Sequence, residues 1–157
     1  MNVSLRPLQE SDAKTSFRWR NNPDIWQFTG SSPDKYVTEA IELAWIRRVL
    51  GSPNELRFAI CAGASSEYVG NAQLTSVTEY DAEFHIFIGD VAWHGKGIGS
   101  LATQQALEYA DSFLRLNEVY LYVHADNTAA INAYFKCGFK FVSGADKRSM
   151  RQMRVML

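Results

Sequence analysis

A glycine-rich segment limits the possible folds of this chain more than any other feature of its sequence. His94-Gly95-Lys96-Gly97-Ile98-Gly99-Ser100 lies between an apolar run typical of a strand and a stretch with helical periodicity. Glycine permits positive φ angles and lets the backbone approach a ligand closely. The first N–H groups of the following helix have no partner within it, and the helix dipole favours an anion beside them. The segment therefore predicts a strand–turn–helix unit that binds an anion such as a pyrophosphate, with Lys96 adding positive charge at the rim.

The spacing of these glycines argues against two common phosphate-binding loops. A Walker loop requires G-x-x-x-x-G-K-[ST], and that spacing is missing. A dinucleotide fingerprint requires G-x-G-x-x-G, whereas the chain has G-x-G-x-G. The fingerprint also needs an acid at the end of the next strand, and Glu118 would lie at the beginning of that strand instead. For this segment taken alone, a glycine turn without a ligand remains an alternative.

The hydrophobic periodicity predicts the elements around this turn. Strands are expected at 3–7, where Pro7 ends the first strand, and at 56–62, 68–77, 82–88, 119–123, 139–142 and 151–157. Helices are expected at 10–21, 36–50, 97–114 and 127–136. The short connections between residues 56 and 88 predict an antiparallel meander. The strand–helix–strand order that follows predicts a parallel pairing. We expect one α/β (α+β) domain over residues 1–157, with a mixed, mostly antiparallel, twisted sheet of about six to seven strands and helices on both faces.

The composition is that of an ordinary globular domain. A chain of 157 residues with 46% hydrophobic content can bury a core of its own, and a net charge of -1 predicts neither nucleic-acid nor membrane-surface binding. Cys61 and Cys137 are too few and too distant for a zinc site, so we expect reduced thiols and no metal. Charged residues such as Arg6 and Glu10 interrupt any secretory signal, and no apolar run approaches the length of about 18 residues typical of a spanning helix. A cytoplasmic protein is expected.

A second motif follows the strand predicted at 119–123. Residues 127–139 read Asn-Thr-Ala-Ala-Ile-Asn-Ala-Tyr-Phe-Lys-Cys-Gly-Phe, and this N-x-x-A-[ILV]-x-x-Y-x-x-x-G-F pattern resembles the second motif of the GNAT acetyltransferases. Residues 94–99 resemble the first motif of that family, [QR]-x-x-G-x-[GA], with His94 in place of the usual Gln or Arg. The two motifs are about thirty residues apart, as in the family. The resemblance covers residues 84–142 well and the N-terminal half more loosely.

Membership of this family implies an acetyl-CoA-dependent N-acetyltransferase in which a primary amine attacks the thioester directly in a ternary complex. The resemblance implies that a parallel strand pair splays apart before the glycine turn. Backbone amides around Phe87, Ile88 and Gly89 would then be free for the pantetheine arm and the thioester carbonyl. Asn127, together with Asn132, would contact the cofactor.

Two proton transfers are needed in such a reaction. The resemblance places Tyr134 beside the cofactor sulfur, where a phenol could protonate the thiolate; the alternative is a tyrosine that only packs. The base is less clearly marked. Glu83 and His85 alternate onto one face of a strand and are both candidates, with residues 79 and 81 as further possibilities.

The acceptor site is expected in the N-terminal half. The run Phe17-Arg18-Trp19-Arg20-Asn21-Asn22 and the following residues Trp26 and Phe28 resemble the family branch that contains ribosomal-protein N-terminal acetyltransferases and nucleotide-amino-sugar N-acetyltransferases. The aromatic residues could stack on a sugar or a base, and an arginine could bind a phosphate. Alternatively, this helix only packs against the core. We therefore expect the acceptor to be a nucleotide-linked amino sugar or a peptide N-terminus. We expect the enzyme to be a monomer or a homodimer. A catalytically silent acyl-CoA-binding module is the alternative function.

Overall fold

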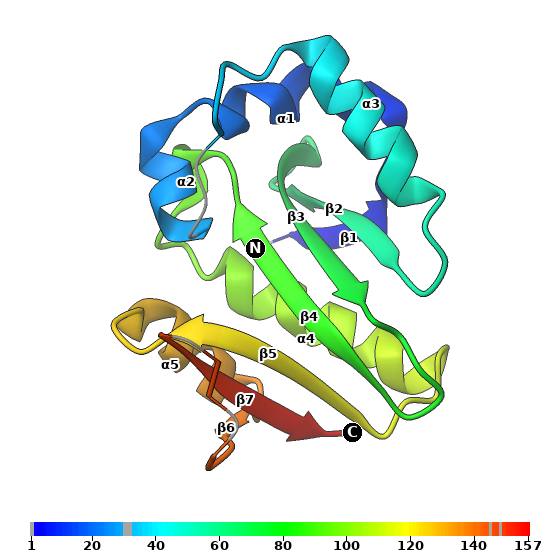
Figure 1. Cartoon of the computed structure of the whole chain (residues 1–157), viewed down its shortest axis with the longest axis vertical. Coiled ribbons are helices and arrows are strands. Elements are labelled where there is room, and N and C mark those ends of the chain that lie inside the picture. The colour runs from blue at the N-terminus through cyan, green and yellow to red at the C-terminus, as the bar shows by residue number, and fades with distance from the viewer. Residues whose placement is uncertain (1, 30–32, 145, 148) are drawn as a thin grey trace.

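A mixed seven-stranded sheet, in the order β1-β2-β3-β4-β5-β7-β6, forms the centre of the described part of the chain (Figure 1). The computed structural model describes residues 2–29, 33–144, 146–147 and 149–157, and the side chains of 27–29 lie outside that description. The strands are β1 (Val3–Pro7), β2 (Leu56–Ala62), β3 (Glu67–Thr75), β4 (Asp81–Ile88), β5 (Glu118–His124), β6 (Lys140–Phe141) and β7 (Met150–Met156). The helices are α1 (Ala13–Arg20), α2 (Pro23–Thr29), α3 (Glu39–Leu50), α4 (Ile98–Ser112) and α5 (Thr128–Lys136), with short 3-10 turns at Glu10–Asp12 and Val91–Trp93.

The pairing of β4 with β5 is the feature of the sheet that creates a site. β2, β3 and β4 form the predicted antiparallel meander. β4 and β5 run parallel, but they pair only from Asp81↔Glu118 to Glu83↔Tyr120. Beyond these residues the two strands diverge, as Figure 1 shows for the green and yellow arrows. The mixed, mostly antiparallel sheet with a splayed parallel pair is therefore confirmed.

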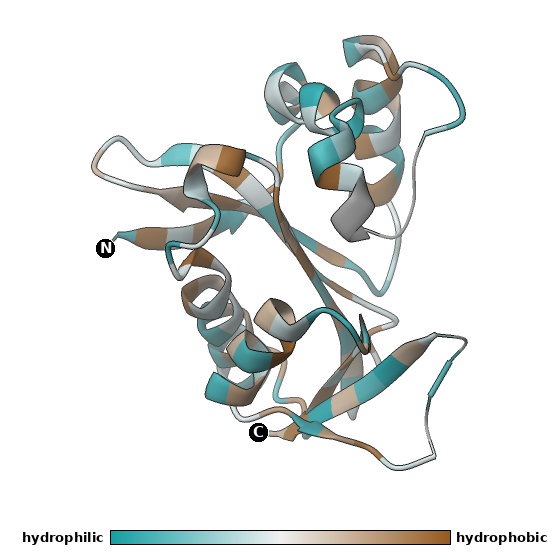
Figure 2. Ribbon diagram, turned by 90° about the vertical axis from the view of Figure 1, so that its left-hand side faces the viewer, coloured by the Kyte–Doolittle hydropathy of each residue, from teal (hydrophilic) through white to brown (hydrophobic). Residues whose placement is uncertain are grey.

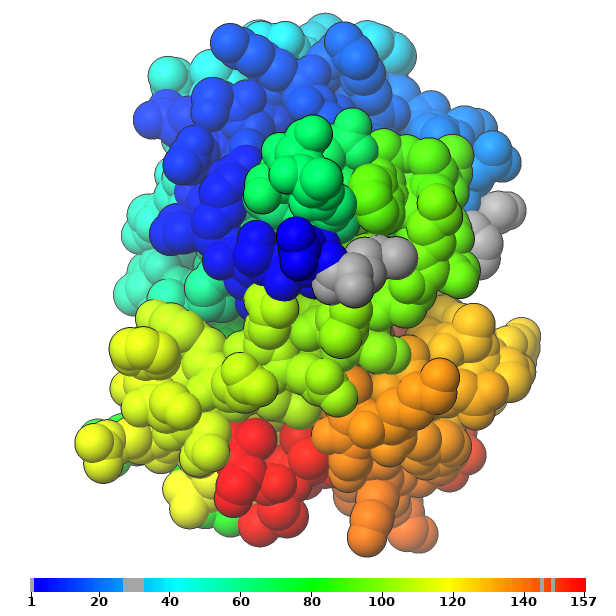
Figure 3. All heavy atoms as spheres, turned by 180° about the vertical axis from the view of Figure 1, so that it is seen from behind, coloured from blue at the N-terminus to red at the C-terminus, as the bar shows by residue number. Residues whose placement is uncertain are grey.

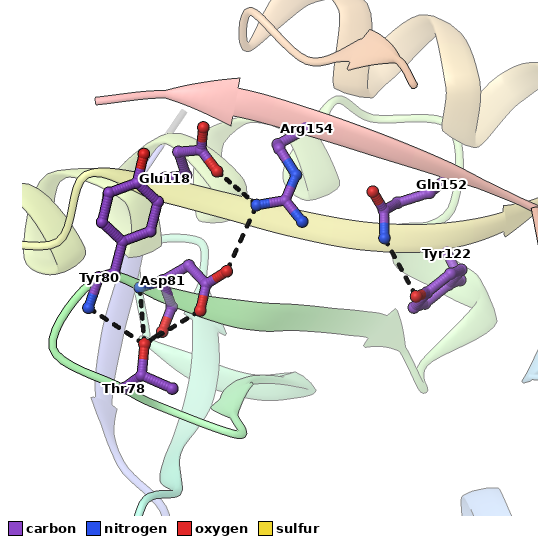
Figure 4. A network of polar contacts seen from close by, with 7 residues as sticks. All are labelled: Thr78, Tyr80, Asp81, Glu118, Tyr122, Gln152 and Arg154. Atoms are coloured by element: carbon purple, nitrogen blue, oxygen red, sulfur yellow. Dashed lines mark hydrogen bonds and ion pairs between the residues drawn. The ribbon is translucent and has the colours of Figure 1, made fainter. Parts of the chain in front are cut away.

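Arg154 on β7 holds the closed end of this splayed pair (Figure 4). Its guanidinium forms ion pairs with Glu118 on β5 and, at 3.3 Å, with Asp81 on β4. The Thr78 hydroxyl donates to the same Asp81 carboxylate at 3.0 Å. Because three strands are joined through one side chain, Asp81 has a structural role and is a poor candidate for the catalytic base.

Helices cover both faces of the sheet, as predicted. α4 and α5 pack on one face against a core that includes Val119, Leu121 and Val123 on alternate positions of β5. A second cluster, which includes Leu8 and Ile46, lies between the opposite face and the N-terminal helices. Figure 2 shows the sheet between these two layers, and Figure 3 shows α4, in yellow-green, beside the orange α5–β6 segment. No helix among the described residues has the length and apolar character needed to cross a membrane.

The N-terminal half differs from the prediction between residues 21 and 36, where no helix was expected. Pro23 instead begins a new helix, α2. Proline is well suited to the first helical position because its missing N–H would have no partner there. The Asn22 side chain also accepts a hydrogen bond from the Asp24 N–H at 3.0 Å. The chain therefore turns and immediately resumes a helix, which adds a wall above the end of β4.

Candidate active site

The glycine turn adopts the conformation that its sequence predicts. Gly95 and Gly97 have φ values of +73° and +79°, and Gly97 is the N-cap of α4. A Cβ atom added to Gly95, Gly97 or Gly99 would meet no atom within 4 Å, so the space above the turn is open. The backbone amides of the first turn of α4 lie next to that space. This arrangement fits the pyrophosphate of acetyl-CoA.

The side chains of the turn have different roles. His94 lies at the predicted Gln/Arg position, and its Nε2–H donates to the Ile88 carbonyl at 2.8 Å, which links the turn to the end of β4. Lys96 is exposed, with its Nζ 5.4 Å from the ring centroid of Trp93. Lys96 and Ser100 are not among the residues that line the cavity described next.

A first cavity of about 430 Å³ lies between β4, α4 and α5. It is lined by Ile25, Ile86, Phe87, Ile88, Trp93, His94, Gly95, Gly97, Ile98, Gly99, Thr103, Asn127, Ala129, Ala130, Ala133 and Tyr134. The two motifs identified in the sequence therefore meet in space. Asn127 also caps α5 by accepting from the Ala130 N–H at 3.2 Å. Asn132, in contrast, is exposed and outside the cavity lining, so its predicted contact with the cofactor has no support in this geometry.

The backbone of β4 presents a different set of amides from the one expected. The Gly89 N–H donates to the Val69 carbonyl at 2.8 Å and is not free. In an antiparallel ladder the bonding direction alternates from residue to residue, so Phe87 also bonds toward β3. The amides of Ile86 and Ile88 then face the gap between β4 and β5. The prediction for Ile88 fits the structure, whereas Ile86 takes the place expected of Phe87 and Gly89.

Tyr134 projects from α5 into the first cavity. Its ring packs against Phe139 with centroids 5.7 Å apart. Burial, followed by the proximity of Cys137, raises the pKa of Tyr134 to about 12. The phenol is therefore protonated at neutral pH, which is the form that can donate a proton or a hydrogen bond into the cavity.

A second cavity of about 780 Å³ lies on the other side of β4, beneath the N-terminal helices. It is lined by Trp19, Arg20, Ile25, Trp26, Pro33, Asp34, Lys35, Val37, Ile41, Glu42, Ala44, Trp45, Arg48, Asn71, Gln73, His85, Ile86 and Phe87. Ile25, Ile86 and Phe87 line both cavities. The two cavities therefore adjoin at the splayed end of β4, where these residues form a common wall.

The residues predicted to contact an acceptor are divided between this cavity and the scaffold. Trp19 and Trp26 line the cavity. Asn21 lies outside the lining, and its side chain bonds the Phe17 and Val37 backbone at 2.7–2.9 Å, so it joins α1 to the segment before α3. The side chain of Phe28 lies outside the described residues.

Gly89 has a packing role that the sequence analysis missed. A Cβ atom at this position would overlap the indole ring of Trp19. Trp19 is buried and lies edge-on to Phe87, with ring centroids 5.9 Å apart. Because Gly89 has no side chain, the Trp19 ring, which lines the second cavity, can pack close to the end of β4.

Arg20 forms a cluster with Glu42 and Trp45 that was not predicted. It pairs at 3.2 Å with Glu42, which is only 2% exposed, and its guanidinium lies 4.2 Å from the ring centroid of Trp45. A signal for this burial exists in the sequence, because Glu42 shares a helical face with Ile46 and Val49. The pairing neutralises Arg20, so this residue is less available for a phosphate than expected.

His85 and Glu83 lie together on β4, as their alternation predicts. The His85 Nε2 atom is 3.0 Å from a Glu83 carboxylate oxygen and 3.2 Å from the Thr75 hydroxyl. Burial lowers the pKa of His85 below its usual value, and the Glu83 charge opposes that shift. His85 lines the second cavity, whereas Glu83 is not in its lining. Within the described ranges, no group of three or more His, Cys, Asp or Glu residues is arranged to hold a metal ion.

Comparisons with known proteins agree with this geometry. Residues 2–140 match a family described as an acetyltransferase (GNAT) domain. The chain is 28% identical over 159 aligned positions to the spermidine N(1)-acetyltransferase of Escherichia coli K12, covering 95% of this chain and 83% of the relative. It is 27% identical to the acetyltransferase PseH of Campylobacter jejuni, covering 81% and 76%. It is 34% identical to the N-alpha-acetyltransferase RimI of Mycobacterium tuberculosis, covering 69% and 73%.

A solved structure shows the same fold. The crystal structure of the Vibrio cholerae spermidine N-acetyltransferase in complex with CoA and spermine superimposes with a TM-score of 0.84 at 23% identity, covering 98% of this chain and 95% of the other. This common fold includes the sheet with its splayed parallel pair, the glycine turn at the start of α4 and the motif on α5. The chain therefore belongs to the GNAT acetyltransferases and is an N-acetyltransferase that uses acetyl-CoA.

Proposed function

We propose that this enzyme acetylates the primary amine of a small, oxygen-rich acceptor, with a nucleotide-linked amino sugar as the favoured class, by direct transfer in a ternary complex. The observation that supports this proposal is that the two cavities share Ile86 and Phe87 in their linings and so adjoin at the splayed end of β4. A cofactor in the first cavity and an acceptor in the second could then react without a covalent enzyme intermediate. Proximity of two bound reactants supplies a large part of the rate enhancement in such a reaction.

The character of the second cavity supports this class of acceptor. Trp19, Trp26 and Trp45 offer aromatic surfaces on which a sugar or base can stack. Arg20 and Glu42 neutralise each other. The remaining charged residues of the lining are the cations Lys35 and Arg48 and the anion Asp34. A polyamine carries several positive charges and would be better matched by an acidic site. The lining is better suited to an acceptor with both an amine and an anionic group.

His85 is proposed as the base that takes the amine proton. If its Nε2–H donates to the Glu83 carboxylate, the neutral ring keeps a basic Nδ1. The lowered pKa of His85 favours this neutral form near pH 7. Glu83 is then a positioning residue that holds the ring, because it acts through His85.

Tyr134 is proposed as the acid that protonates the departing thiolate. The acetyl thioester of acetyl-CoA supplies the group to be transferred. The new N–C bond replaces the C–S bond, His85 takes the proton from the nitrogen, and the Tyr134 hydroxyl gives a proton to sulfur. The Ile86 and Ile88 amides lie where they could stabilise the negative charge that develops on the carbonyl oxygen.

A thiol-release assay with acetyl-CoA tests the choice of acceptor. The panel should contain UDP-linked amino sugars, free amino sugars, spermidine, amino acids and short peptides. We expect the highest kcat/KM with a nucleotide-linked amino sugar. A higher kcat/KM with peptides would favour the N-terminal acetyltransferase alternative, and a higher value with spermidine would contradict the proposed class.

A further inference from the structure

Asn71 is a buried polar residue that neither sequence motif includes. It lies on β3 at the floor of the second cavity and is only 5% exposed. In the β3–β4 ladder it lies opposite Phe87, which lines both cavities. Its side chain is therefore close to the point at which the two cavities meet.

Tyr68 determines which way the Asn71 carboxamide points. The Tyr68 hydroxyl donates to the Asn71 Oδ1 atom at 2.6 Å. That separation is usual for an O–H···O bond and short for an N–H···O bond, so the carboxamide oxygen faces Tyr68. The Nδ2 group must then point the other way, toward the cavity. Across the described part of the chain, no protein oxygen accepts a hydrogen bond from Asn71 Nδ2.

The surroundings of Tyr68 keep its hydroxyl in the donating form. Burial, with the Asp12 and Glu42 carboxylates, raises the pKa of Tyr68 above its usual value. Asp12 is itself held by Arg6, with a closest approach of 2.7 Å. The ring of Trp19 packs against Tyr68 with centroids 4.8 Å apart. The phenol is therefore fixed in place and protonated, and the carboxamide orientation does not change with pH in the physiological range.

We propose that Asn71 is a specificity-determining residue that donates hydrogen bonds to an oxygen of the acceptor near its reactive amine. This inference rests on the proposed function, in which the second cavity holds the acceptor. The Nδ2 group is not among the side-chain atoms that are buried without a partner, so solvent can reach it in the free protein. A ligand that excludes this solvent without bringing an oxygen leaves two N–H donors unpaired, which is costly, so a ligand with an oxygen is favoured. A protonated polyamine offers only N–H donors and methylene groups, so it has no acceptor for the Asn71 Nδ2 donors. An amino sugar offers hydroxyl and ring oxygens beside its amine.

Matched amines test this directly. Thiol release is measured with glucosamine and UDP-glucosamine, which carry oxygens near the amine, and with cyclohexylamine and spermidine, which do not. The proteins are the wild type, Asn71→Leu and Tyr68→Phe. The Leu variant removes the donors, whereas the Phe variant keeps Asn71 but frees its carboxamide to rotate. Calorimetric titration with acetyl-CoA reports whether each variant retains its fold and its first cavity.

We expect the wild type to favour the oxygen-bearing amines over cyclohexylamine and spermidine. Asn71→Leu should reduce that preference at least tenfold, mainly through the KM of the oxygen-bearing amine, with unchanged acetyl-CoA affinity. Tyr68→Phe should reduce the preference by a smaller factor. Unchanged preference in both variants would overturn the inference, as would a wild-type enzyme that uses neither oxygen-bearing amine or that prefers spermidine.

Trp26→Ala separates this inference from the proposed function. Trp26 lines the same cavity but belongs to α2. If Trp26→Ala raises the acceptor KM while Asn71→Leu does not, the second cavity binds the acceptor and only the role of Asn71 is wrong. If neither change affects any acceptor KM, the second cavity is not the acceptor site and the proposed function also fails.

Discussion

The two cavities are lined by different kinds of residue. Six of the sixteen residues that line the first cavity are glycines of the turn or alanines of α5, which leave the backbone accessible, and all but Ile25 lie between residues 86 and 134. The second is lined by tryptophans and charged residues from α1, α2, α3 and the segment before α3, together with polar residues of β3 and β4. A site made of backbone groups can bind the same cofactor in many proteins, whereas a site made of large side chains can change its ligand by substitution. The comparison therefore predicts that changes on one side should alter acetyl-CoA binding and changes on the other should alter acceptor use.

Tyr134→Phe should have the largest effect, because this residue is proposed to act where the two sides meet. The change keeps the ring packed against Phe139 and removes only the hydroxyl. If the phenol protonates the thiolate, kcat should fall by roughly 10²–10⁴ with little change in acetyl-CoA affinity. Single-turnover kinetics and calorimetry measure the two quantities. A fall below about threefold with chemistry rate-limiting would remove Tyr134 from the proton transfer.

His85→Gln should reduce kcat by about 10²–10³, in the lower half of the range for a general base. Because burial lowers the pKa of His85, the wild-type activity should be constant near neutral pH and fall only as pH drops through that lowered value. Glu83→Gln removes a charge that raises the pKa of His85, so the acidic limb should move to still lower pH. Rate profiles across pH 4–8 check both shifts. An unmoved limb in Glu83→Gln would argue that another group controls it.

Gly97→Val tests the backbone side of the comparison. A β-branched residue at φ +79° is strained by about 1–2 kcal/mol, so the turn should relax to another backbone conformation in which its amides no longer face the pyrophosphate. Acetyl-CoA affinity should therefore fall at least tenfold while the second cavity is unchanged. Calorimetry gives the affinity, and circular dichroism controls for folding. Undiminished CoA binding by a folded variant would contradict the role assigned to the turn.

Gly89→Ala should have the smallest effect and should appear on the acceptor side. The added methyl group would overlap the buried indole ring of Trp19, so that ring would have to move. Acceptor KM should rise a few-fold, with acetyl-CoA affinity within twofold of wild type. Steady-state kinetics with both substrates varied separates these values. If acetyl-CoA affinity falls instead, Gly89 belongs functionally to the first cavity, as its backbone position had suggested.

Pairs of residues show where interpretation of the sequence succeeded and where it failed. Gly97 and Tyr134, which the resemblance assigned to one cofactor site, line the same cavity, and each lies in a motif with fixed local geometry. Asn132 lies in the same motif but is exposed, since a pattern of spacing does not by itself orient each helical side chain. Gly89 was expected to offer a free amide, and only the β3–β4 register revealed that this amide bonds Val69.

Local sequence was sufficient for the meander, the glycine turn, the helix after it and the motif on α5. Each depends on backbone preferences and periodicity within about 15 residues, so neighbouring residues carry the information. Tertiary structure alone decided that Glu42 pairs with Arg20 and that Tyr68 orients Asn71. It also decided that the two cavities meet at Ile86 and Phe87. The contact between Arg20 and Glu42 joins two helices, so it follows from long-range packing. The position of the two cavities depends on where β4 diverges from β5, so it follows from strand register. No local sequence pattern determines either of them.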